Sequence, residues 1–195
     1  MLATIYRQSA VWGFNIGRRG ATSAAERAIN FLFYNAAPHT FITVDSDLKN
    51  FIESYYLMWV PWFKLNHRNV ESFRRDGDRT VIGLEGNSHV DLDWANKTYS
   101  VTLDGAEIAR DGSTFCPLDN ERIAFYSADA KELSAPLPRG WESNSIAAIA
   151  LSADKPQPLE LKVEGGQVTV AVPAQRPVIV YREGDKAKKR LLAAG

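Results

Sequence analysis

Cysteine is almost absent from the sequence: Cys116 is the only one among 195 residues. A disulfide within the chain is therefore excluded. A thiolate metal site is not expected either, because such sites need several cysteines. Cys116 lies in the apolar stretch Thr-Phe-Cys-Pro-Leu, which favours a buried, inert thiol.

An excess of charge of either sign is also absent. Lysine and arginine together number 23, as do aspartate and glutamate, so the formal net charge is zero. No overall basic field attracts nucleic acid or an anionic membrane, and we expect neither as a partner. The local exception is Lys186, Lys188, Lys189 and Arg190, which predict a solvated basic tail over residues 186–195.

Long apolar runs and common catalytic motifs are lacking too. No segment approaches the ~18–20 apolar residues of a membrane span. Residues 1–7 lack the features of a signal peptide, so a secreted parent protein is expected to carry its signal upstream. The three histidines lack metal-site spacing, and neither a glycine-rich phosphate loop nor a Gly-x-Ser-x-Gly nucleophile motif is found.

The first of two distinct parts of the sequence, residues 1–69, is rich in aromatic residues and is predicted to be partly helical. One helix is predicted over residues 22–33, where a hydroxyl cap precedes apolar residues at helical spacing. A second is predicted to begin at Asp45 or the next residue, and Pro61 is expected to stop it. Residues 55–63 are too apolar for an exposed helix and need a large partner surface.

From about Val70 the hydrophobic period changes from helical to two, which predicts strands. Asx-Gly and Gly-Gly pairs, which supply positive φ for tight hairpins, separate them. Together these features predict a mainly β fold: an antiparallel β-sandwich over residues 70–185, preceded by the smaller helical or mixed segment. The predicted strands cover residues 70–74, 80–85, 89–94, 98–103, 122–127, 146–151, 159–163, 168–172 and 178–181.

The last predicted hairpin has the clearest pattern. Leu159, Leu161 and Val163 alternate with charged residues, and valines alternate again after Gly165-Gly166. One face should be buried and the other solvated. The apolar strand that follows, residues 178–181, is expected to lie inside the sandwich.

The second half of the chain carries an ordered set of short motifs. They are Asp111-Gly112-Ser113-Thr114-Phe115-Cys116-Pro117, Leu137-Pro138-Arg139-Gly140-Trp141 and Arg176-Pro177-Val178-Ile179-Val180-Tyr181-Arg182. Their order over residues 98–182 resembles the domains that follow the catalytic barrel in endo-α-N-acetylgalactosaminidases, glycoside hydrolase family 101. That family is similar in its Leu-Pro-x-x-Trp element and in its closing Pro-Val-x-Tyr-Arg-like strand.

The resemblance implies the C-terminal accessory portion of a glycoside hydrolase that acts on O-linked glycans of the galactosyl-N-acetylgalactosamine type. Residues 1–69 would be the end of a (β/α) barrel, and the sandwich would brace it. Family members place the nucleophile and acid on earlier barrel strands, so no catalytic residue is assigned here. The implied partners are carbohydrate and the rest of the catalytic barrel, and the implied location is extracellular or at the cell surface.

The candidate polar site lies on the predicted strand over residues 89–94. Asp91 and Asp93 alternate there with apolar residues, which puts both carboxylates on one face together with His89. The ordinary interpretation is the solvated face of a sheet. The functional one is a calcium or sugar-hydroxyl site, so Asp91 and Asp93 are carried as a candidate metal site. Ca²⁺ is the one candidate cofactor.

Sugar rings stack on exposed aromatic faces, and Trp94 and Trp141 are the candidates for carbohydrate contact. Trp141 follows Leu-Pro-Arg-Gly at a loop-to-strand corner, where a core side chain between the sheets is the competing interpretation. Two alternatives to the enzyme portion stay open. One is a stand-alone β-sandwich module that binds carbohydrate without catalysis, and the other is a structural or interaction domain.

Overall fold

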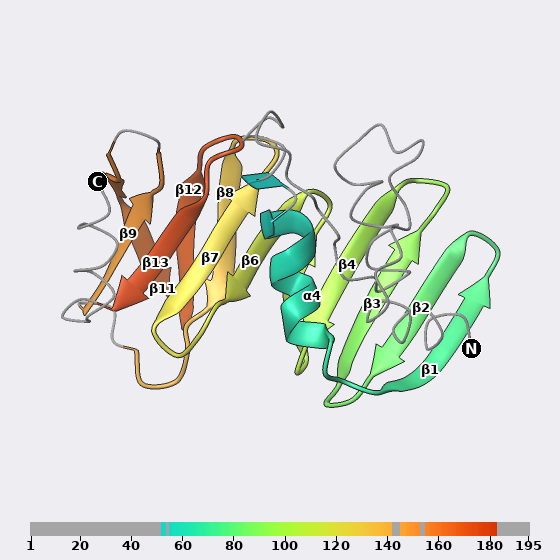
Figure 1. Cartoon of the computed structure of the whole chain (residues 1–195). Coiled ribbons are helices and arrows are strands. Elements are labelled where there is room, and N and C mark those ends of the chain that lie inside the picture. Colours follow the sequence, from blue (N-terminus) through green and yellow to red (C-terminus); the bar gives the residue numbers. More distant parts are fainter. Residues whose placement is uncertain (1–51, 54, 142–144, 153–154, 183–195) are drawn as a thin grey trace. The chain divides into compact units, whose positions relative to one another are not determined.

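The computed structural model describes residues 52–53, 55–141, 145–152 and 155–182 (Figure 1). Contacts divide the chain into two compact units, unit 1 (residues 1–112) and unit 2 (residues 113–195). Antiparallel strands dominate the described part of each unit and a short helical segment precedes them, which confirms the predicted mainly β fold class. The predicted helix over residues 22–33 and the basic tail lie outside the described residues.

The described helical part begins with a π-helical turn, η1 (Tyr55–Trp59), which leads into the α-helix α4 (Val60–Leu65). The prediction that Pro61 stops this helix is wrong. Pro61 occupies the first turn of α4, where its missing N–H has no helical partner to lose, and the wider winding of η1 precedes it. In the part of the chain that the structure describes, no helix is long and apolar enough to cross a membrane.

Unit 1 contains an antiparallel meander in which each strand pairs with the next along the chain. Left-handed backbone occurs at the predicted turns, as at Gly77 (φ 55°), Lys97 (φ 57°) and Gly105 (φ 81°). The strands are β1 (Val70–Asp76), β2 (Arg79–Leu84), β3 (Ser88–Asp93), β4 (Thr98–Leu103) and β5 (Ala106–Arg110).

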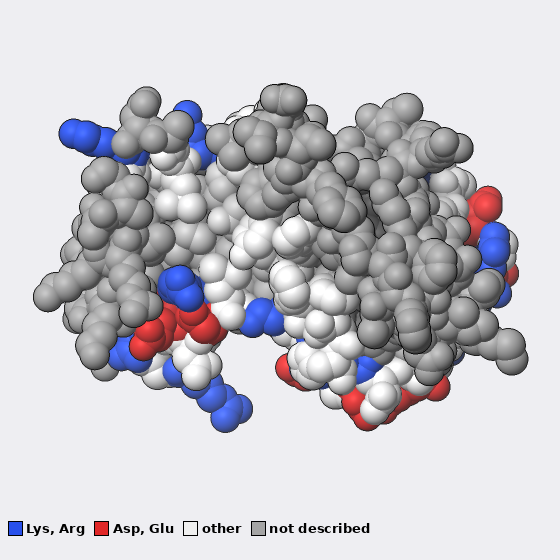
Figure 2. Space-filling view, in the orientation of Figure 1, with Lys and Arg blue, Asp and Glu red and all other residues white. Residues whose placement is uncertain are grey.

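The meander has one apolar and one polar face, because successive side chains alternate along each strand. The helix α4 contacts β4 and buries its own Val60 and Leu65. The first strand, β1, lies at the end of the strand order, and its exposed charged side chains show at the right of Figure 2. Charge on an edge strand discourages pairing with other chains. The buried side chains of β2, β3 and β4 include Ile82, Leu84, Val90, Leu92, Tyr99 and Val101.

A polar cluster ties the end of α4 to the turns of the meander; we call it the Arg68 clasp (Arg68, Glu85, Ser88 and Asp104). The Arg68 guanidinium donates to the Glu85 carbonyl (2.8 Å) and Ser88 Oγ (3.1 Å). It also donates to both carboxylate oxygens of Asp104 (2.8 and 2.9 Å). A Cβ at Gly86 would stand 2.3 Å from Arg68 Nη1. A side chain at position 86 would therefore push the Arg68 guanidinium out of the clasp, and the left-handed backbone there (φ 72°) also favours glycine.

Unit 2 contains two sheets. One has the order β6 (Ser113–Pro117), β7 (Arg122–Ser127), β13 (Val178–Arg182), β9 (Ile146–Ala150) and β10 (Gln157–Leu159). The other has the order β11 (Leu161–Glu164), β12 (Gln167–Val172) and β8 (Lys131–Pro136). The apolar strand β13 pairs with β7 on one side and β9 on the other, and Val178 to Tyr181 are all buried. The expected interior position of this strand is confirmed.

The two sheets of unit 2 enclose one hydrophobic core, so this unit is a sandwich. Trp141, from the segment between β8 and β9, packs in the same core. Each fully buried aliphatic or aromatic side chain of this kind contributes about 1.5–3 kcal/mol through removal from water. The core residues are Ile123, Phe125, Ala135, Trp141, Ile146, Ala148, Ala150, Val168, Val170, Val172, Val178 and Val180.

The observed strands differ from the predicted ones in two respects: one predicted strand is divided in two, and three further strands are present. The prediction of a single strand over residues 159–163 is wrong, since Leu159 ends β10 and Leu161 begins β11. The chain crosses from one sheet to the other at Glu160. The strands β5, β6 and β8 are not evident from the sequence pattern, because they are short and rich in small or polar residues. In β8 only Ala135 is buried.

Candidate functional site

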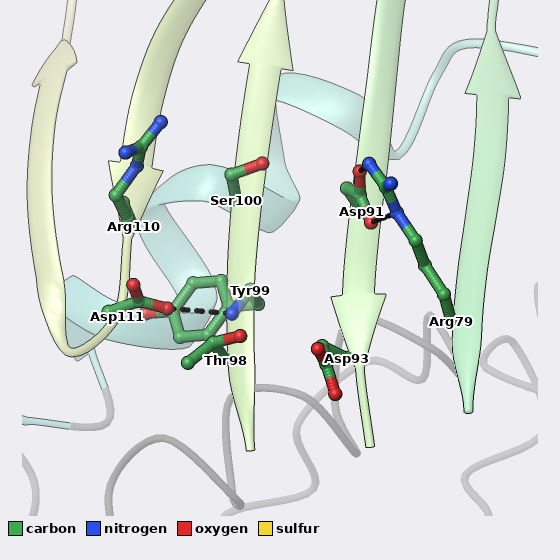
Figure 3. A pocket seen from close by; sticks show the side chains of 8 residues that line it. All are labelled: Arg79, Asp91, Asp93, Thr98, Tyr99, Ser100, Arg110 and Asp111. Atoms are coloured by element: carbon green, nitrogen blue, oxygen red, sulfur yellow. Dashed lines mark hydrogen bonds and ion pairs between the residues drawn. The ribbon is translucent and has the colours of Figure 1, made fainter. Parts of the chain in front are cut away.

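A surface hollow of about 260 Å³ lies on the polar face of the meander in unit 1 (Figure 3). Strands β2, β3 and β4 and the end of β5 supply its walls. In Figure 3 the helix α4 lies behind these strands, on the other side of the sheet. The lining residues are Arg79, Asp91, Asp93, Thr98, Tyr99, Ser100, Arg110 and Asp111.

Strand register brings the polar side chains of the hollow together. Asp91 lies opposite Ser100, which in turn lies opposite Arg110. Asp93 lies between its partners Arg79 and Thr98. Directly paired residues share a face, so these side chains form two adjacent rows across the sheet. Asp91 and Asp93 therefore lie on one face, as their spacing predicts.

Asp91 forms an ion pair with Arg79 across the β2–β3 pair. Arg79 Nε donates to Asp91 Oδ1 at 3.0 Å, and Arg79 Nη2 donates to Asp91 Oδ2. The hydrogen bond to Asp91 raises the pKa of the Arg79 guanidinium. Two-point contact fixes the direction of both side chains, but the arginine is 66% exposed, so the pair adds little to stability.

Asp93 closes the turn between β3 and β4. Its Oδ1 accepts the Asn96 backbone N–H at 2.9 Å, and its Oδ2 accepts the Asn96 side-chain amide at 2.8 Å. These hydrogen bonds, the backbone one first, lower the pKa of Asp93 below its ordinary value of 3.8. The carboxylate therefore stays ionised at neutral pH and faces the hollow as a negative charge.

The β4–β5 side of the hollow contains polar atoms that are not used within the fold. Asp111 Oδ1 accepts the Tyr99 backbone N–H at 2.7 Å, and Arg110 Nε and Nη2 donate to Glu107. Within the described residues, Asp111 Oδ2, Arg110 Nη1 and the Thr98 and Ser100 hydroxyls have no hydrogen-bond partner. These atoms are the ones that a bound molecule can use.

Calcium binding by Asp91 and Asp93 stays a prediction. Each of the two carboxylates already accepts two hydrogen bonds from protein donors, which fits a hydrogen-bonding surface better than a cation cage. His89 lies on the same face, opposite Thr102, but does not line the hollow. In the described part of the chain, no group of three or more His, Cys, Asp or Glu residues is placed to hold a metal.

The two candidate tryptophans belong to different units. Trp94 follows β3 in unit 1 and is half-buried, and its Nε1 donates to Thr80 Oγ1 at 3.2 Å. Trp141 in unit 2 is 8% exposed, and its Nε1 donates to the Asn120 carbonyl at 2.9 Å. Burial of this kind fits the interpretation of Trp141 as a core side chain. Sugar stacking by either residue stays a prediction.

Most of the lining residues do not stand out in the sequence as site residues. Arg79, Thr98, Ser100, Arg110 and Asp111 surround the two predicted aspartates. Thr98 and Ser100 alternate with the buried Tyr99 and Val101, so their placement on a polar face was readable from β4 itself. The pairing of β4 with both β3 and β5 was not readable, because cross-strand register depends on the whole meander.

Comparison with known proteins finds weak structural similarity to glycoside hydrolases. One is the catalytic domain of GH30 xylanase C from Talaromyces cellulolyticus, with 15% identity over 54% of this chain and 20% of that chain, at a TM-score of 0.23. Another is a family 39 glycoside hydrolase from Bacteroides cellulosilyticus WH2, with 10% identity over 82% of this chain and 30% of that chain, at a TM-score of 0.25.

The chain spans less than a third of the length of each of these two proteins. TM-scores this low do not establish a shared fold, so the similarity carries no conclusion about activity. No protein-family model matches the sequence, and no curated protein matches it.

Proposed function

We propose that the chain is an accessory portion of a glycoside hydrolase acting on O-linked glycans of the galactosyl-N-acetylgalactosamine type, and that unit 1 contacts carbohydrate at the hollow. The observation that carries the carbohydrate role is the set of unused donors and acceptors on the β4–β5 side. The Ser100 hydroxyl and Asp111 Oδ2 line the same hollow as the Arg79–Asp91 pair.

This set suits sugar hydroxyls, which each donate and accept hydrogen bonds. A carboxylate oxygen such as Asp111 Oδ2 accepts from a hydroxyl, and such charge-assisted hydrogen bonds are about twice as strong as neutral ones. The hydroxyls of Thr98 and Ser100 can act in either direction. The hollow therefore offers several convergent polar contacts, as sites for small polar molecules do.

The accessory role follows from the resemblance of residues 98–182, and the sandwich of unit 2 supports it. The Leu-Pro-Arg-Gly-Trp motif ends in Trp141, which packs in the sandwich core, so the motif helps to build the sandwich. In this proposal the sandwich braces the catalytic barrel of the parent protein outside the cell. The catalytic carboxylates then lie outside this chain.

A stand-alone binding module is the second candidate. It is favoured by the fact that every lining residue of the hollow comes from β2 to β5 or from Asp111, all within unit 1. Such a site needs no catalytic barrel to be complete. A bracing portion and a free-standing module differ in whether the chain retains glycans by itself, and a purely structural domain would retain none.

The test pairs a glycan-binding screen with a hydrolysis assay on an aryl galactosyl-β1,3-N-acetylgalactosaminide. We expect binding without turnover, and at least a tenfold loss of affinity in the double variant Ser100→Ala, Asp111→Asn, because two hydrogen bonds to the sugar are lost or weakened. The matched control is Ser134→Ala, whose hydroxyl pairs with Thr169 at 2.7 Å in the smaller sheet of unit 2. Turnover would place catalytic carboxylates within the chain. No retention of any glycan would contradict the carbohydrate role.

A further inference from the structure

We propose that the hollow selects neutral over acidic sugars, an inference that rests on the carbohydrate role proposed above. The first observation is its charge. Three carboxylates line it, those of Asp91, Asp93 and Asp111, against the two guanidinium groups of Arg79 and Arg110, so the lining carries a net charge of −1. A ligand that brings its own carboxylate or sulfate adds negative charge to a negative surface.

The second observation is that each arginine already pairs with a protein carboxylate through two of its nitrogens. Arg79 donates through Nε and Nη2 to Asp91, and Arg110 donates through the same two nitrogens to Glu107. Proteins usually bind an anionic sugar through such a two-point arginine contact. Here the charge of each guanidinium is already balanced by Asp91 or Glu107, so an acidic ligand finds no uncompensated positive charge in the lining.

The third observation concerns what is left for a ligand to contact. The partner-free groups on the β4–β5 side are the Thr98 and Ser100 hydroxyls, Asp111 Oδ2 and the single nitrogen Arg110 Nη1. Two hydroxyls and a carboxylate oxygen match the hydroxyl groups of a neutral sugar. Asp111 Oδ2 repels an anionic ligand, and Arg110 Nη1 belongs to a guanidinium whose charge Glu107 already balances.

The size of the preference for neutral sugars depends on the distance between the ligand's negative charge and that of the lining, in a site open to water. One unit of unfavourable charge about 6 Å away, at an effective dielectric constant between that of the protein surface and that of water, weakens binding by roughly three- to tenfold. Salt screens such a surface interaction over a distance of about 10 Å at moderate ionic strength. The difference in affinity between neutral and acidic sugars should therefore become smaller as salt is added. Hydrogen bonding to the neutral sugar should change little.

The experiment titrates the full chain with galactosyl-β1,3-N-acetylgalactosamine and with the same disaccharide carrying one sialic acid, by calorimetry at low and at high salt. The informative variant is Asp111→Asn, which keeps the Oδ1 acceptor for the Tyr99 N–H and removes one negative charge from the lining. The control is Glu164→Gln, which removes the same charge from the exposed end of β11 in unit 2.

We expect the neutral disaccharide to bind roughly three- to tenfold more tightly than the acidic one at low salt. Asp111→Asn should reduce this preference and Glu164→Gln should leave it unchanged. If the acidic disaccharide binds as tightly or more tightly, or if both variants change the preference equally, the inference is overturned while the carbohydrate role survives. If neither disaccharide nor any glycan of the screen binds, the carbohydrate role itself is overturned.

Discussion

The two units bury the apolar side chains of their strands in different ways. In unit 2 the strands of two sheets share one core, and the middle strand β13 is buried through four successive residues. In unit 1 the meander strands β2, β3 and β4 alternate regularly between buried and partly exposed positions. A strand buried on both faces has no side chains left for a ligand. A strand with one apolar face leaves its other face for polar chemistry.

The polar surfaces of the two units also differ. On the smaller sheet of unit 2, Ser134 and Thr169 bond to each other at 2.7 Å across β8 and β12. On unit 1, the Thr98 and Ser100 hydroxyls find no partner within the described residues. Polar side chains that satisfy one another stabilise a surface, whereas unsatisfied ones that converge on a hollow are available for binding. This difference is why the candidate site lies in unit 1.

The substitution Trp141→Ala is the strongest test of this difference between the two units. This change removes a large side chain from a core that both sheets of unit 2 build, and we expect a loss of about 3–5 kcal/mol in the free energy of unfolding. Urea denaturation measures the loss. Hydrogen exchange should locate it in β7, β9 and β13, while β2 to β4 keep their protection.

The control is Trp94→Ala in unit 1, where removal of a half-buried indole should cost less. An equal loss of protection in both units would show that they unfold as one body.

The Arg68 clasp predicts a smaller effect in unit 1. Gly86→Ala places a Cβ 2.3 Å from Arg68 Nη1 at a φ of +72°, so the guanidinium must move away from its partners. We expect a loss of about 1–3 kcal/mol. Gly77→Ala is the matched control, because its φ is also positive (+55°) and no atom lies within 4 Å of the added carbon. It should cost only the backbone strain, about 1 kcal/mol. Equal losses, measured by thermal denaturation, would mean that the clasp contributes nothing.

The smallest expected effect is the acid sensitivity of the β3–β4 turn. Asp93 has a pKa below its ordinary value of 3.8 because the Asn96 backbone N–H, and then the Asn96 side chain, donate to the carboxylate. A lowered folded-state pKa gives stabilisation that is complete above 3.8 and is lost as pH falls through the folded value. Asn96→Ala should move the Asp93 titration, followed by nuclear magnetic resonance, upward toward 3.8. Because alanine keeps the backbone N–H, a titration that does not respond would show that the Asn96 side chain does not contribute to the lowered pKa.

Much of the fold was readable from local pattern. Alternation along Val168, Val170 and Val172 predicts the buried face of β12, and all three are buried. The Gly165-Gly166 pair predicts the β11–β12 hairpin, which the pairing of Glu164 with Gln167 confirms. These predictions hold because hydrophobic period and turn chemistry act within a few residues. The continuation of α4 past Pro61 was not readable, because it depends on the π-helical turn that precedes the proline.

Local sequence pattern is enough to predict that this protein is mainly β, that its closing apolar strand is interior, and that Asp91 and Asp93 share one face. Each of these follows from residues close together in the chain. The folded chain is needed to show that Arg79, Ser100 and Arg110 join the two aspartates, and that Trp141 packs in a core. Register across β2 to β5 and the facing of two sheets depend on contacts between residues far apart in the sequence, and the pattern within one strand does not specify its partner.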